Sequence, residues 1–209
     1  MRPSAKHELA RHPDLEHLAG YLWKREGARL AWLAQRVPAG QVIVELGSNQ
    51  GKSSCFLARG SSRGNHVPIH CVDLWDLGGQ WEHTHLRTGA PLRFEHPQTL
   101  RTFHEQTAPF SDLIVEHKAP STAVGQSWDG PPVGLLFIDG DHSYPGVRGD
   151  IEAWERHVAP GGWVCFHDYN RGRKEAKDYP GITCAVDEWM ARRKVRDAVR
   201  TQKLLTVQL

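Results

Sequence analysis

Short apolar runs alternate along the chain with longer stretches in which apolar residues recur at helical spacing. A short apolar run bounded by turn residues is typical of a buried strand, whereas helical spacing is typical of an amphipathic helix. The runs that we expect to form strands are 42–46, 69–74, 112–117, 133–139 and 162–167. The helices expected among them are 53–59, a stretch near 97–106, and 144–158. This alternation predicts an α/β fold with a mainly parallel, doubly wound sheet that is covered by helices on both faces.

The two ends of the chain carry patterns of their own. Leucines and aromatic side chains recur at helical spacing over 14–37, and the Pro-Ala-Gly segment that follows breaks this helix before the first strand. We therefore expect residues 1–38 to be a helical extension of one domain that spans residues 1–209. Apolar residues alternate over 205–209, as in an antiparallel strand that closes a sheet.

Composition narrows the class of protein. A length of 209 residues suits one domain with a full core, and a formal net charge of +2 gives no electrostatic footprint for nucleic acid. The cysteines have no C-x-x-C spacing, and Cys55, Cys71 and Cys165 lie in or beside apolar runs, as buried free thiols of a reducing compartment do. No apolar run has the length of a membrane span or of a signal-peptide core. We therefore expect a cytoplasmic protein that binds neither nucleic acid nor a membrane.

The segment from Gln41 to Ser53, with the sequence QVIVELGSNQGKS, carries the clearest functional signal. An apolar strand that contains Glu45 turns through Gly47 and Gly51 into a helix. Glycine adopts backbone angles closed to other residues and admits a close neighbour. Such a turn leaves unpaired backbone N–H groups at the start of the helix, where ligands commonly bind. The spacing within the turn then decides which ligand fits.

Two nucleotide motifs come close to this turn without matching it. The dinucleotide motif G-x-G-x-x-G needs a glycine at its middle position, where the chain has Asn49. The phosphate loop of nucleotide triphosphatases needs one more residue between Gly47 and the G-K-S triplet that starts at Gly51. A triphosphate-binding enzyme that uses Lys52 stays as an alternative, because the strand that ends in Asp139 would suit its magnesium ion.

The pattern E-x-G-x-x-x-G at Glu45, Gly47 and Gly51 resembles the first motif of class I S-adenosylmethionine-dependent methyltransferases. In that family the glycine turn passes under the methionine part of the cofactor, and an acid at the end of the next strand binds the ribose hydroxyls. Asp73, which closes the run IHCVD, stands at that place. A carboxylate suits this role because it accepts hydrogen bonds from two neighbouring hydroxyls.

Two further segments strengthen the resemblance. The sequence FIDGDHSY begins at Phe137, and PGGWVCFHDY begins at Pro160. Together with the first motif they are similar to the small-molecule branch of the family, which includes macrocin O-methyltransferase-like and cephalosporin-hydroxylase-like proteins. The resemblance implies a Rossmann-like sheet of seven strands with a reversed C-terminal strand. It also implies methyl transfer from S-adenosylmethionine to a hydroxyl of a small molecule such as a sugar, polyketide or peptide.

The resemblance assigns the cofactor to residues near the ends of the predicted strands. These are Glu45, Gly47, Ser48, Asn49, Gly51, Ser53, Asp73, Leu74, Ser121 and Asp139. Ser121 stands where the family contacts the adenine end, and a turn started by Pro120 is the alternative. The carboxyl ends of parallel strands lie on one edge of an open sheet, so we expect the cofactor site there.

The acceptor end of the site is implied by comparison with metal-dependent relatives. In those proteins the aspartate that ends the fourth strand and a polar pair at the end of the next strand bind a metal, which by position implies Asp139 and Asp168 as ligands of a divalent ion. His167 would be the third ligand if the pair is His167 and Asp168; if the pair starts at Asp168, Tyr169 stands where an amide is usual and Asn170 is one place late. Mg²⁺ is favoured, and a histidine ligand would admit manganese, iron or zinc. His142 stands where catechol-type relatives carry a basic residue, and it would take the acceptor's proton. Asp141 would contact substrate or cofactor, or else Asp141 and His142 would only cap the helix that follows.

Other features leave more than one interpretation. The long polar segment 75–87, just after Asp73, is predicted to be a lid or a substrate wall. A chain that binds the cofactor but transfers no methyl group is a non-enzymatic alternative. The expected partner is a small-molecule acceptor, and a homodimer stays open.

Overall fold

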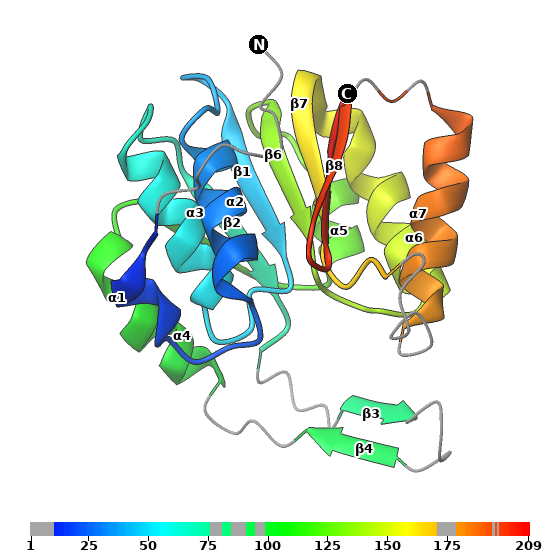
Figure 1. The fold of residues 1–209 in the computed structure, drawn as a ribbon, viewed down its shortest axis with the longest axis horizontal. Helices are drawn as coiled ribbons and strands as arrows, with labels where there is room; N and C mark the ends of the chain where they lie inside the picture. Colours follow the sequence, from blue (N-terminus) through cyan, green and yellow to red (C-terminus); the bar gives the residue numbers. More distant parts are fainter. Residues whose placement is uncertain are drawn as a thin grey trace.

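The computed structural model describes residues 11–75, 81–84, 91–94, 99–170, 179–193, 195 and 197–209. Its central feature is a seven-stranded sheet with the order β5-β2-β1-β6-β7-β9-β8 (Figure 1). The strands are β1 (Val42–Leu46), β2 (Ile69–Asp73), β5 (Ile114–Lys118), β6 (Val133–Ile138), β7 (Val158–Phe166), β8 (Asp197–Thr201) and β9 (Leu204–Gln208). The neighbours from β5 to β7 are parallel, whereas β9 is antiparallel to both β7 and β8. The predicted Rossmann-like sheet with an antiparallel C-terminal strand is confirmed.

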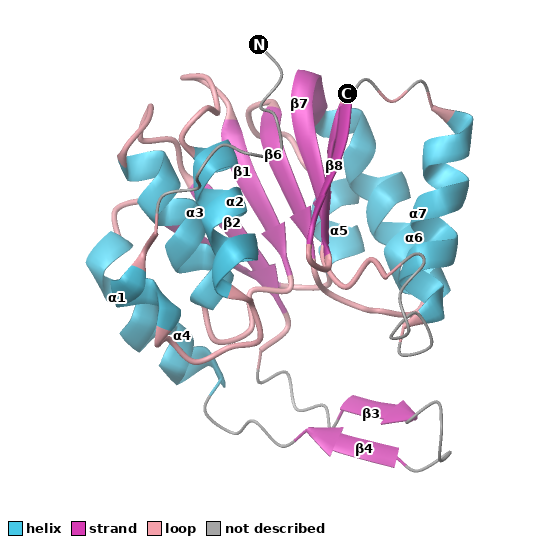
Figure 2. Ribbon diagram, viewed as in Figure 1, coloured by secondary structure: helices cyan, strands magenta, loops and turns pink. Residues whose placement is uncertain are grey.

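Helices cover both faces of this sheet (Figure 2). They are α1 (Pro13–Glu16), α2 (Lys24–Ala34), α3 (Lys52–Ser62), α4 (Thr99–Thr107), α5 (Ser121–Gln126), α6 (Tyr144–Trp154) and α7 (Pro180–Arg192), with 3-10 turns at Ala108–Phe110 and Glu155–His157. On one face Phe56 of α3 and Phe103 of α4 pack in an apolar cluster with Ile43. On the other face Trp154 of α6 packs in a second cluster with Val44. The core therefore consists of two apolar layers with the sheet between them.

The sequence of β1 explains the two layers. Every residue of this strand is buried, and successive side chains on a strand point to opposite faces. Ile43 lies in one cluster and Val44 in the other. Central parallel strands that are buried on both faces read as continuous apolar runs, and for this reason the predicted bounds of β1 match the structure. Glu45 is the polar exception in the strand, and its alternation with Val44 places it on the α3 face.

The N-terminal extension differs from its prediction. The single helix predicted over 14–37 is two helices, α1 and α2, separated by residues 17–23. Gly20 in this break has a φ of 130°, a conformation that glycine adopts readily and other residues rarely adopt. Leu22 is buried in the α3-side cluster and Leu18 packs against it, so apolar spacing continues where the helix does not. The helical spacing of the leucines over 14–37 predicted their burial correctly, but the prediction of one continuous helix was wrong.

Several elements have no counterpart in the predicted pattern. These are α5, α7, β8 and a separate antiparallel pair of strands, β3 (Trp81–Thr84) and β4 (Pro91–Phe94). The pair lies partly in the segment 75–87 predicted as a lid, and residues 76–80 and 85–87 of that segment are outside the described residues. The lid therefore stays a prediction. Over the described ranges, no helix has the length and apolar character needed to cross a membrane.

Candidate active site

Four central strands end on the same edge of the sheet (Figure 1). Gly47 follows β1, Asp73 ends β2 and Asp139 follows β6. His167 and Asp168 follow β7. Parallel sheets bind ligands at the carboxyl ends of their strands, so this edge is the place to look for the site.

The glycine turn after β1 is shaped by two close neighbours. Gly47 and Gly51 both have a φ of 89°, in the left-handed region that favours glycine. A Cβ on Gly47 would lie 2.3 Å from the carbonyl oxygen of Asp139, so this glycine lets the turn pack against the end of β6. A Cβ on Gly51 would lie 3.0 Å from Phe103 and from Thr107. The space that Gly51 provides is therefore taken up by α4.

The carboxylate of Asp73 holds the glycine turn in place. Asp73 Oδ2 accepts a hydrogen bond from the backbone N–H of Asn49 at 2.8 Å, and Oδ1 accepts one from the backbone N–H of Trp75 at 2.7 Å. The indole Nε1 of Trp75 in turn donates to the carbonyl oxygen of Asn49 at 2.9 Å. Burial raises the pKa of Asp73, and these N–H groups offset part of the rise. A carboxylate oxygen accepts more than one hydrogen bond, so lone pairs remain for two ribose hydroxyls.

Glu45 lies beneath the same turn. Its side chain is fully buried, and Ser54 in the first turn of α3 donates a hydrogen bond to Oε2. Burial raises the pKa of Glu45, and the hydroxyls of Ser53 and Ser54 partly offset this rise. Ser48 is also buried. Glu45 therefore supports the turn from the core side, and its direct contact with a cofactor stays a prediction.

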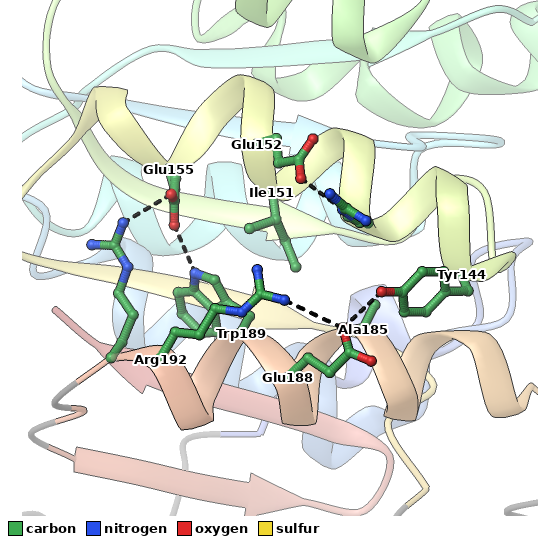
Figure 3. A pocket seen from close by; sticks show the side chains of 10 residues that line it. Tyr144, Ile151, Glu152, Glu155, Ala185, Glu188, Trp189 and Arg192 are labelled. Carbon is green, nitrogen blue, oxygen red and sulfur yellow. Dashed lines mark hydrogen bonds and ion pairs between the residues drawn. The ribbon is translucent and has the colours of Figure 1, made fainter.

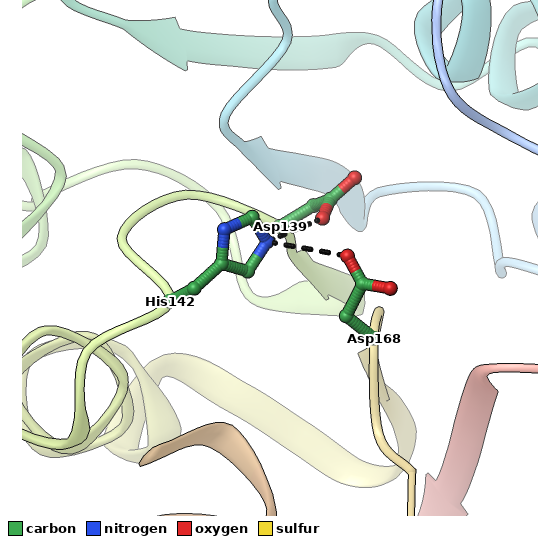
Figure 4. Close-up of side chains that lie close together, drawn as sticks. All are labelled: Asp139, His142 and Asp168. Atoms are coloured by element: carbon green, nitrogen blue, oxygen red, sulfur yellow. Dashed lines mark hydrogen bonds and ion pairs between the residues drawn. The ribbon is translucent and has the colours of Figure 1, made fainter. Parts of the chain in front are cut away.

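Asp139, His142 and Asp168 point toward one another beyond β6 and β7 (Figure 4). His142 Nε2 lies 3.4 Å from Asp139 Oδ1 and 3.5 Å from Asp168 Oδ2. One ligand atom from each of these residues lies within 4.8 Å of the others. The ring of Tyr179 packs against His142 with the ring centroids 4.7 Å apart. Burial lowers the pKa of His142, but the neighbouring Asp139 carboxylate outweighs this effect and leaves the pKa raised.

His167 lies behind this acid–histidine cluster of Asp139, His142 and Asp168. Its Nδ1 is 3.1 Å from Asp139 Oδ1, and its Nε2 is 3.1 Å from Glu26 Oε2. Each ring nitrogen thus faces a carboxylate oxygen, which suits an imidazole that donates from both nitrogens. Burial lowers the pKa of His167, but the carboxylates raise it by more, to well above its ordinary value. An imidazole that donates from both nitrogens has no lone pair for a metal, so this geometry does not favour the metal role predicted for His167, which stays a prediction.

The surroundings of the two carboxylates of the cluster favour their ionised forms. Burial alone would raise the pKa of Asp139 and of Asp168. The neighbouring His167 and His142 rings together outweigh burial and leave both pKa values below their ordinary range. Lys203, in the turn between β8 and β9, contributes at Asp168, where its Nζ lies 3.2 Å from Oδ1.

Two predicted residues make contacts of another kind. Asp141 accepts hydrogen bonds from the backbone N–H of Ser143 at 2.8 Å and from its hydroxyl at 3.0 Å, and Ser143 Oγ accepts from the N–H of Gly146. These are the contacts of a helix cap, and a catalytic role for Asp141 stays a prediction. The Nζ of Lys52 donates to the carbonyl oxygen of Glu16 at 3.3 Å. The lysine that a phosphate loop would need is thus bound to the end of α1.

Ser121 and Leu74 are the predicted contacts for the adenine end of the cofactor. Leu74 is half-buried and directly follows β2. Ser121 is the first residue of α5, and its hydroxyl donates to the carboxylate of Asp150 in α6. The structure places both at the expected edge of the sheet, and their contacts with a cofactor stay predictions.

Glu26 and Lys203 are site neighbours that sequence reasoning missed. Glu26 is fully buried, although it is a charged residue of α2. One signal could have identified it, because Glu26 falls at helical spacing among the buried residues Leu22, Leu30 and Leu33. A carboxylate on the apolar face of a helix needs a partner in the core. Lys203 carries no such signal, because its position depends on how the last two strands return to the sheet.

Away from these residues, a groove lies between α6 and α7 (Figure 3). Its volume is about 490 Å³. The hydroxyl of Tyr144 donates to Glu188 at 2.7 Å, and Glu155 accepts from the indole of Trp189 at 2.7 Å and pairs with Arg193 at 2.8 Å. The arginines and glutamates that line this groove pair with one another, and none of the lining residues belongs to the acid–histidine cluster or the glycine turn.

Solved structures with a similar fold include proteins described with a bound cofactor, with SAM or with SAH. Cofactor-bound Rv0187 from MTB has a TM-score of 0.65 at 17% identity, over 93% of this chain and 84% of that one. The O-methyltransferase from Bacillus cereus in complex with SAH has a TM-score of 0.64 at 18% identity, over 91% and 84%. TomG from Streptomyces achromogenes in complex with SAM has a TM-score of 0.62 at 17% identity, over 94% and 82%. At these identities the likeness concerns the fold.

Two curated relatives bear names that state no activity. Uncharacterized protein y4gI of Sinorhizobium fredii is 29% identical over 151 residues, which are 70% of this chain and 15% of that protein. Uncharacterized protein R132 of Acanthamoeba polyphaga mimivirus is 34% identical over 59 residues, which are 28% of this chain and 27% of that protein. The chain thus matches less than a third of the length of either relative.

The family comparison covers the site itself. The sequence model of a family described as a methyltransferase domain matches residues 44–169, more than half of the chain. This segment contains the glycine turn, Asp73 and all three residues of the acid–histidine cluster. The chain belongs to the class I S-adenosylmethionine-dependent methyltransferase family.

Proposed function

We propose that the chain transfers a methyl group from S-adenosylmethionine to a hydroxyl oxygen of a small molecule. The observation that carries this proposal is that Asp73, the glycine turn and the acid–histidine cluster occupy the carboxyl edge of one sheet. The first two suit the sugar and amino-acid parts of the cofactor, and the cluster suits an oxygen that must lose a proton. Similar folds in Bacillus cereus and in TomG belong to proteins named O-methyltransferases.

At the cofactor end, Asp73 and Asn49 would form a prepared cradle. The hydrogen bonds from Asn49 and Trp75 fix the direction of the Asp73 carboxylate before any ligand binds. A binding group that is already oriented loses less conformational entropy on binding. The ribose hydroxyls would donate to the lone pairs of Asp73 that these backbone groups leave free.

At the acceptor end, methyl transfer is an in-line displacement. The acceptor oxygen attacks the methyl carbon, the carbon–sulfur bond breaks, S-adenosylhomocysteine leaves and the oxygen loses its proton. The facing oxygens of Asp139 and Asp168 would align the acceptor, and His142 in its neutral form would receive that proton at Nε2. The raised pKa of His142 makes its neutral form a stronger base, at the cost of a smaller neutral fraction at a given pH.

The same three side chains would hold a divalent ion. Two carboxylates and one imidazole within 4.8 Å form a donor set that suits Mn²⁺ or Zn²⁺, and that admits Mg²⁺ when water supplies the other ligands. Such an ion, when bound, lowers the pKa of the hydroxyl that it contacts. His142 would then be a ligand, and the ion would replace it as the group that promotes proton loss.

An acceptor screen tests the proposed function. The protein is incubated with methyl-labelled S-adenosylmethionine and a panel of sugars, phenols and hydroxylated peptides, and transfer of label is measured. We expect transfer to at least one hydroxyl acceptor, and we expect Asp139→Ala to abolish transfer while S-adenosylhomocysteine still binds. Cofactor binding without transfer to any acceptor would favour a non-catalytic binding protein. Binding of ATP that Lys52→Ala removes, with no affinity for the methyl donor, would favour the triphosphate-binding alternative.

A further inference from the structure

Glu26 is a fully buried carboxylate in α2 that contacts three donors from different parts of the chain. Its Oε2 accepts from the backbone N–H of Trp23 at 3.1 Å and lies 3.1 Å from His167 Nε2. Its Oε1 accepts from the backbone N–H of Lys203 at 2.8 Å. A carboxylate buried without partners is strongly destabilising, so these contacts are what allow Glu26 to be in the core.

Two of these residues, His167 and Lys203, also contact the carboxylates at the acceptor end of the site. The Nδ1 of His167 lies 3.1 Å from Asp139 Oδ1 and 3.5 Å from Asp168 Oδ2. The side chain of Lys203 reaches Asp168 Oδ1 at 3.2 Å, and the carbonyl oxygen of Lys203 accepts from the backbone N–H of Tyr169. The carboxylates that face His142 are therefore held from behind by groups that Glu26 fixes.

We infer that Glu26 is a positioning residue for methyl transfer, because it fixes His167 and Lys203 and thereby sets the direction of the Asp139 and Asp168 carboxylates. Glu26 can have this role only if the chain is the methyltransferase proposed above. Without the Glu26 carboxylate, the Nε2–H of His167 loses its acceptor, and the ring is no longer held in the orientation that directs Nδ1–H to Asp139. Loss of such a supporting contact typically lowers metal affinity or activity by about 10–100-fold.

The position of Glu26 in the sequence adds to the inference. Glu26 and Lys203 both lie outside residues 44–169, the segment that the methyltransferase-domain family matches. The N-terminal helix α2 and the C-terminal β8–β9 turn thus meet at one buried carboxylate, directly behind the acid–histidine cluster. The α2 helix and the β8–β9 turn would then contribute to the active site in addition to packing on the sheet.

The test compares Glu26→Gln with Glu105→Gln, a matched change at an exposed glutamate that pairs with Arg101 in α4. Mn²⁺ affinity is measured by electron paramagnetic resonance, and S-adenosylhomocysteine affinity by calorimetry. We expect Glu26→Gln to weaken Mn²⁺ binding by about 10–100-fold while S-adenosylhomocysteine affinity stays at the wild-type value. Glu105→Gln should change neither. Unchanged Mn²⁺ affinity in Glu26→Gln would overturn the inference, as would a parallel loss of both affinities, which would indicate general structural damage.

A double-mutant comparison shows whether Glu26 acts through His167. In a His167→Asn background, Glu26→Gln should cause little further loss of Mn²⁺ affinity, because the link is already broken. A full additional loss would contradict an action through His167. If Glu26→Gln does not fold, the ring protons of ¹⁵N-labelled histidine in the wild-type protein decide the point. His167 should then show an Nε2–H signal protected from exchange, and an Nε2 that carries no proton would overturn the inference.

Failure of the proposed function has a different signature. A wild-type protein that does not bind S-adenosylhomocysteine would refute the methyltransferase proposal, whatever the Glu26 variants do. A wild-type protein that binds the cofactor but no Mn²⁺ would refute the metal site, and the ring-proton measurement would then decide the role of Glu26. Normal Mn²⁺ and cofactor binding in Glu26→Gln would refute the positioning role alone.

Discussion

At the scale of single residues, Gly40 and Gly47 have similar backbone conformations and different surroundings. Their φ values are 82° and 89°. Nothing lies within 4 Å of the place where a Cβ on Gly40 would be, whereas a Cβ on Gly47 would lie 2.3 Å from the Asp139 carbonyl oxygen. Comparing the two positions separates the cost of a left-handed backbone from the cost of pushing the glycine turn off the end of β6.

We expect Gly40→Ala to lower the free energy of unfolding by about 1 kcal/mol, the cost of a left-handed backbone for a residue with a side chain. Gly47→Ala should cost about 2 kcal/mol more, because the added methyl group must displace backbone at the end of β6. Urea denaturation of both variants measures this difference. Gly47→Ala should also weaken S-adenosylhomocysteine binding, because the turn would move relative to Asp73. Equal losses of stability in the two variants would contradict the close packing of the turn.

The carboxylate of Asp73 is the residue on which cofactor affinity should depend most. Asp73→Ala removes the acceptors for the ribose hydroxyls, and we expect S-adenosylmethionine binding to weaken by about 1–3 kcal/mol, as for a lost hydrogen bond to a charged group. Calorimetric titration measures the change. Asp112→Ala, at an exposed carboxylate that pairs with His66, is the control and should leave affinity unchanged. Wild-type affinity in Asp73→Ala would contradict the assignment.

At the scale of elements, β2 and β5 carry a histidine pair on one face. His70 Nδ1 and His117 Nε2 lie 2.9 Å apart, and the ring of Trp128 packs edge-on against His70. One nitrogen of this contact must donate and the other accept, so the pair suits two neutral rings. Burial, together with repulsion from His117 when that ring is protonated, lowers the pKa of His70 from its ordinary 6.5 to about 4. Burial lowers the pKa of His117 as well.

This pair predicts a loss of stability in acid. A histidine whose pKa is lower in the folded state binds protons more weakly than in the unfolded chain, so its contribution is present above pH 6.5 and is lost as the pH falls toward about 4. Over that interval we expect this pair to lower the free energy of unfolding of the wild-type protein by about 1–3 kcal/mol. The loss is no larger because the two rings are only half-buried, so solvent screens their charges. Denaturation curves at each pH should show a shallower loss in His70→Gln than in the wild type or in the surface control His66→Gln. Identical pH dependence in all three would contradict the neutral pair.

The ends of β6 and β7 predict a response to chelation. If Asp139, His142 and Asp168 hold a divalent ion, removing metal with EDTA should abolish methyl transfer, and added Mn²⁺ should restore it. Affinity for S-adenosylhomocysteine should change little, because Asp73 and the glycine turn do not belong to the cluster. Full transfer in the presence of EDTA would contradict a metal requirement and leave His142 to accept the proton by itself.

Elements with a distinct local pattern were predicted, and those without one were not. β1 and β6 are buried on both faces and have continuous apolar runs, and α6 begins at an N-cap contact of Ser143. β8 has no fully buried residue and α5 has only 6 residues, so neither has a strong apolar pattern. Asp73, Asp139 and Asp168 could be expected on one edge because strand ends gather there, whereas His142 was implied by the family resemblance. Glu26 and Lys203 reach the site only through contacts between distant segments, which local pattern does not encode.

At the scale of the whole molecule, the site combines three parts of the chain. The central strands supply the glycine turn, Asp73 and the acid–histidine cluster, α2 supplies Glu26, and the β8–β9 turn supplies Lys203. The phosphate-loop alternative is weakened at this scale, because Lys52 donates to the end of α1. If the chain is a methyltransferase, the cofactor must therefore bind at the carboxyl edge of the sheet, between Asp73 and the acid–histidine cluster.

A crystal structure of the protein with S-adenosylhomocysteine tests that claim most directly. The account predicts that both ribose hydroxyls donate to the Asp73 carboxylate, that the homocysteine part lies over the glycine turn, and that the sulfur faces Asp139 and His142. The account would be contradicted if the ligand lay elsewhere, or if the glycine turn bound the phosphates of ATP and left S-adenosylhomocysteine in solution.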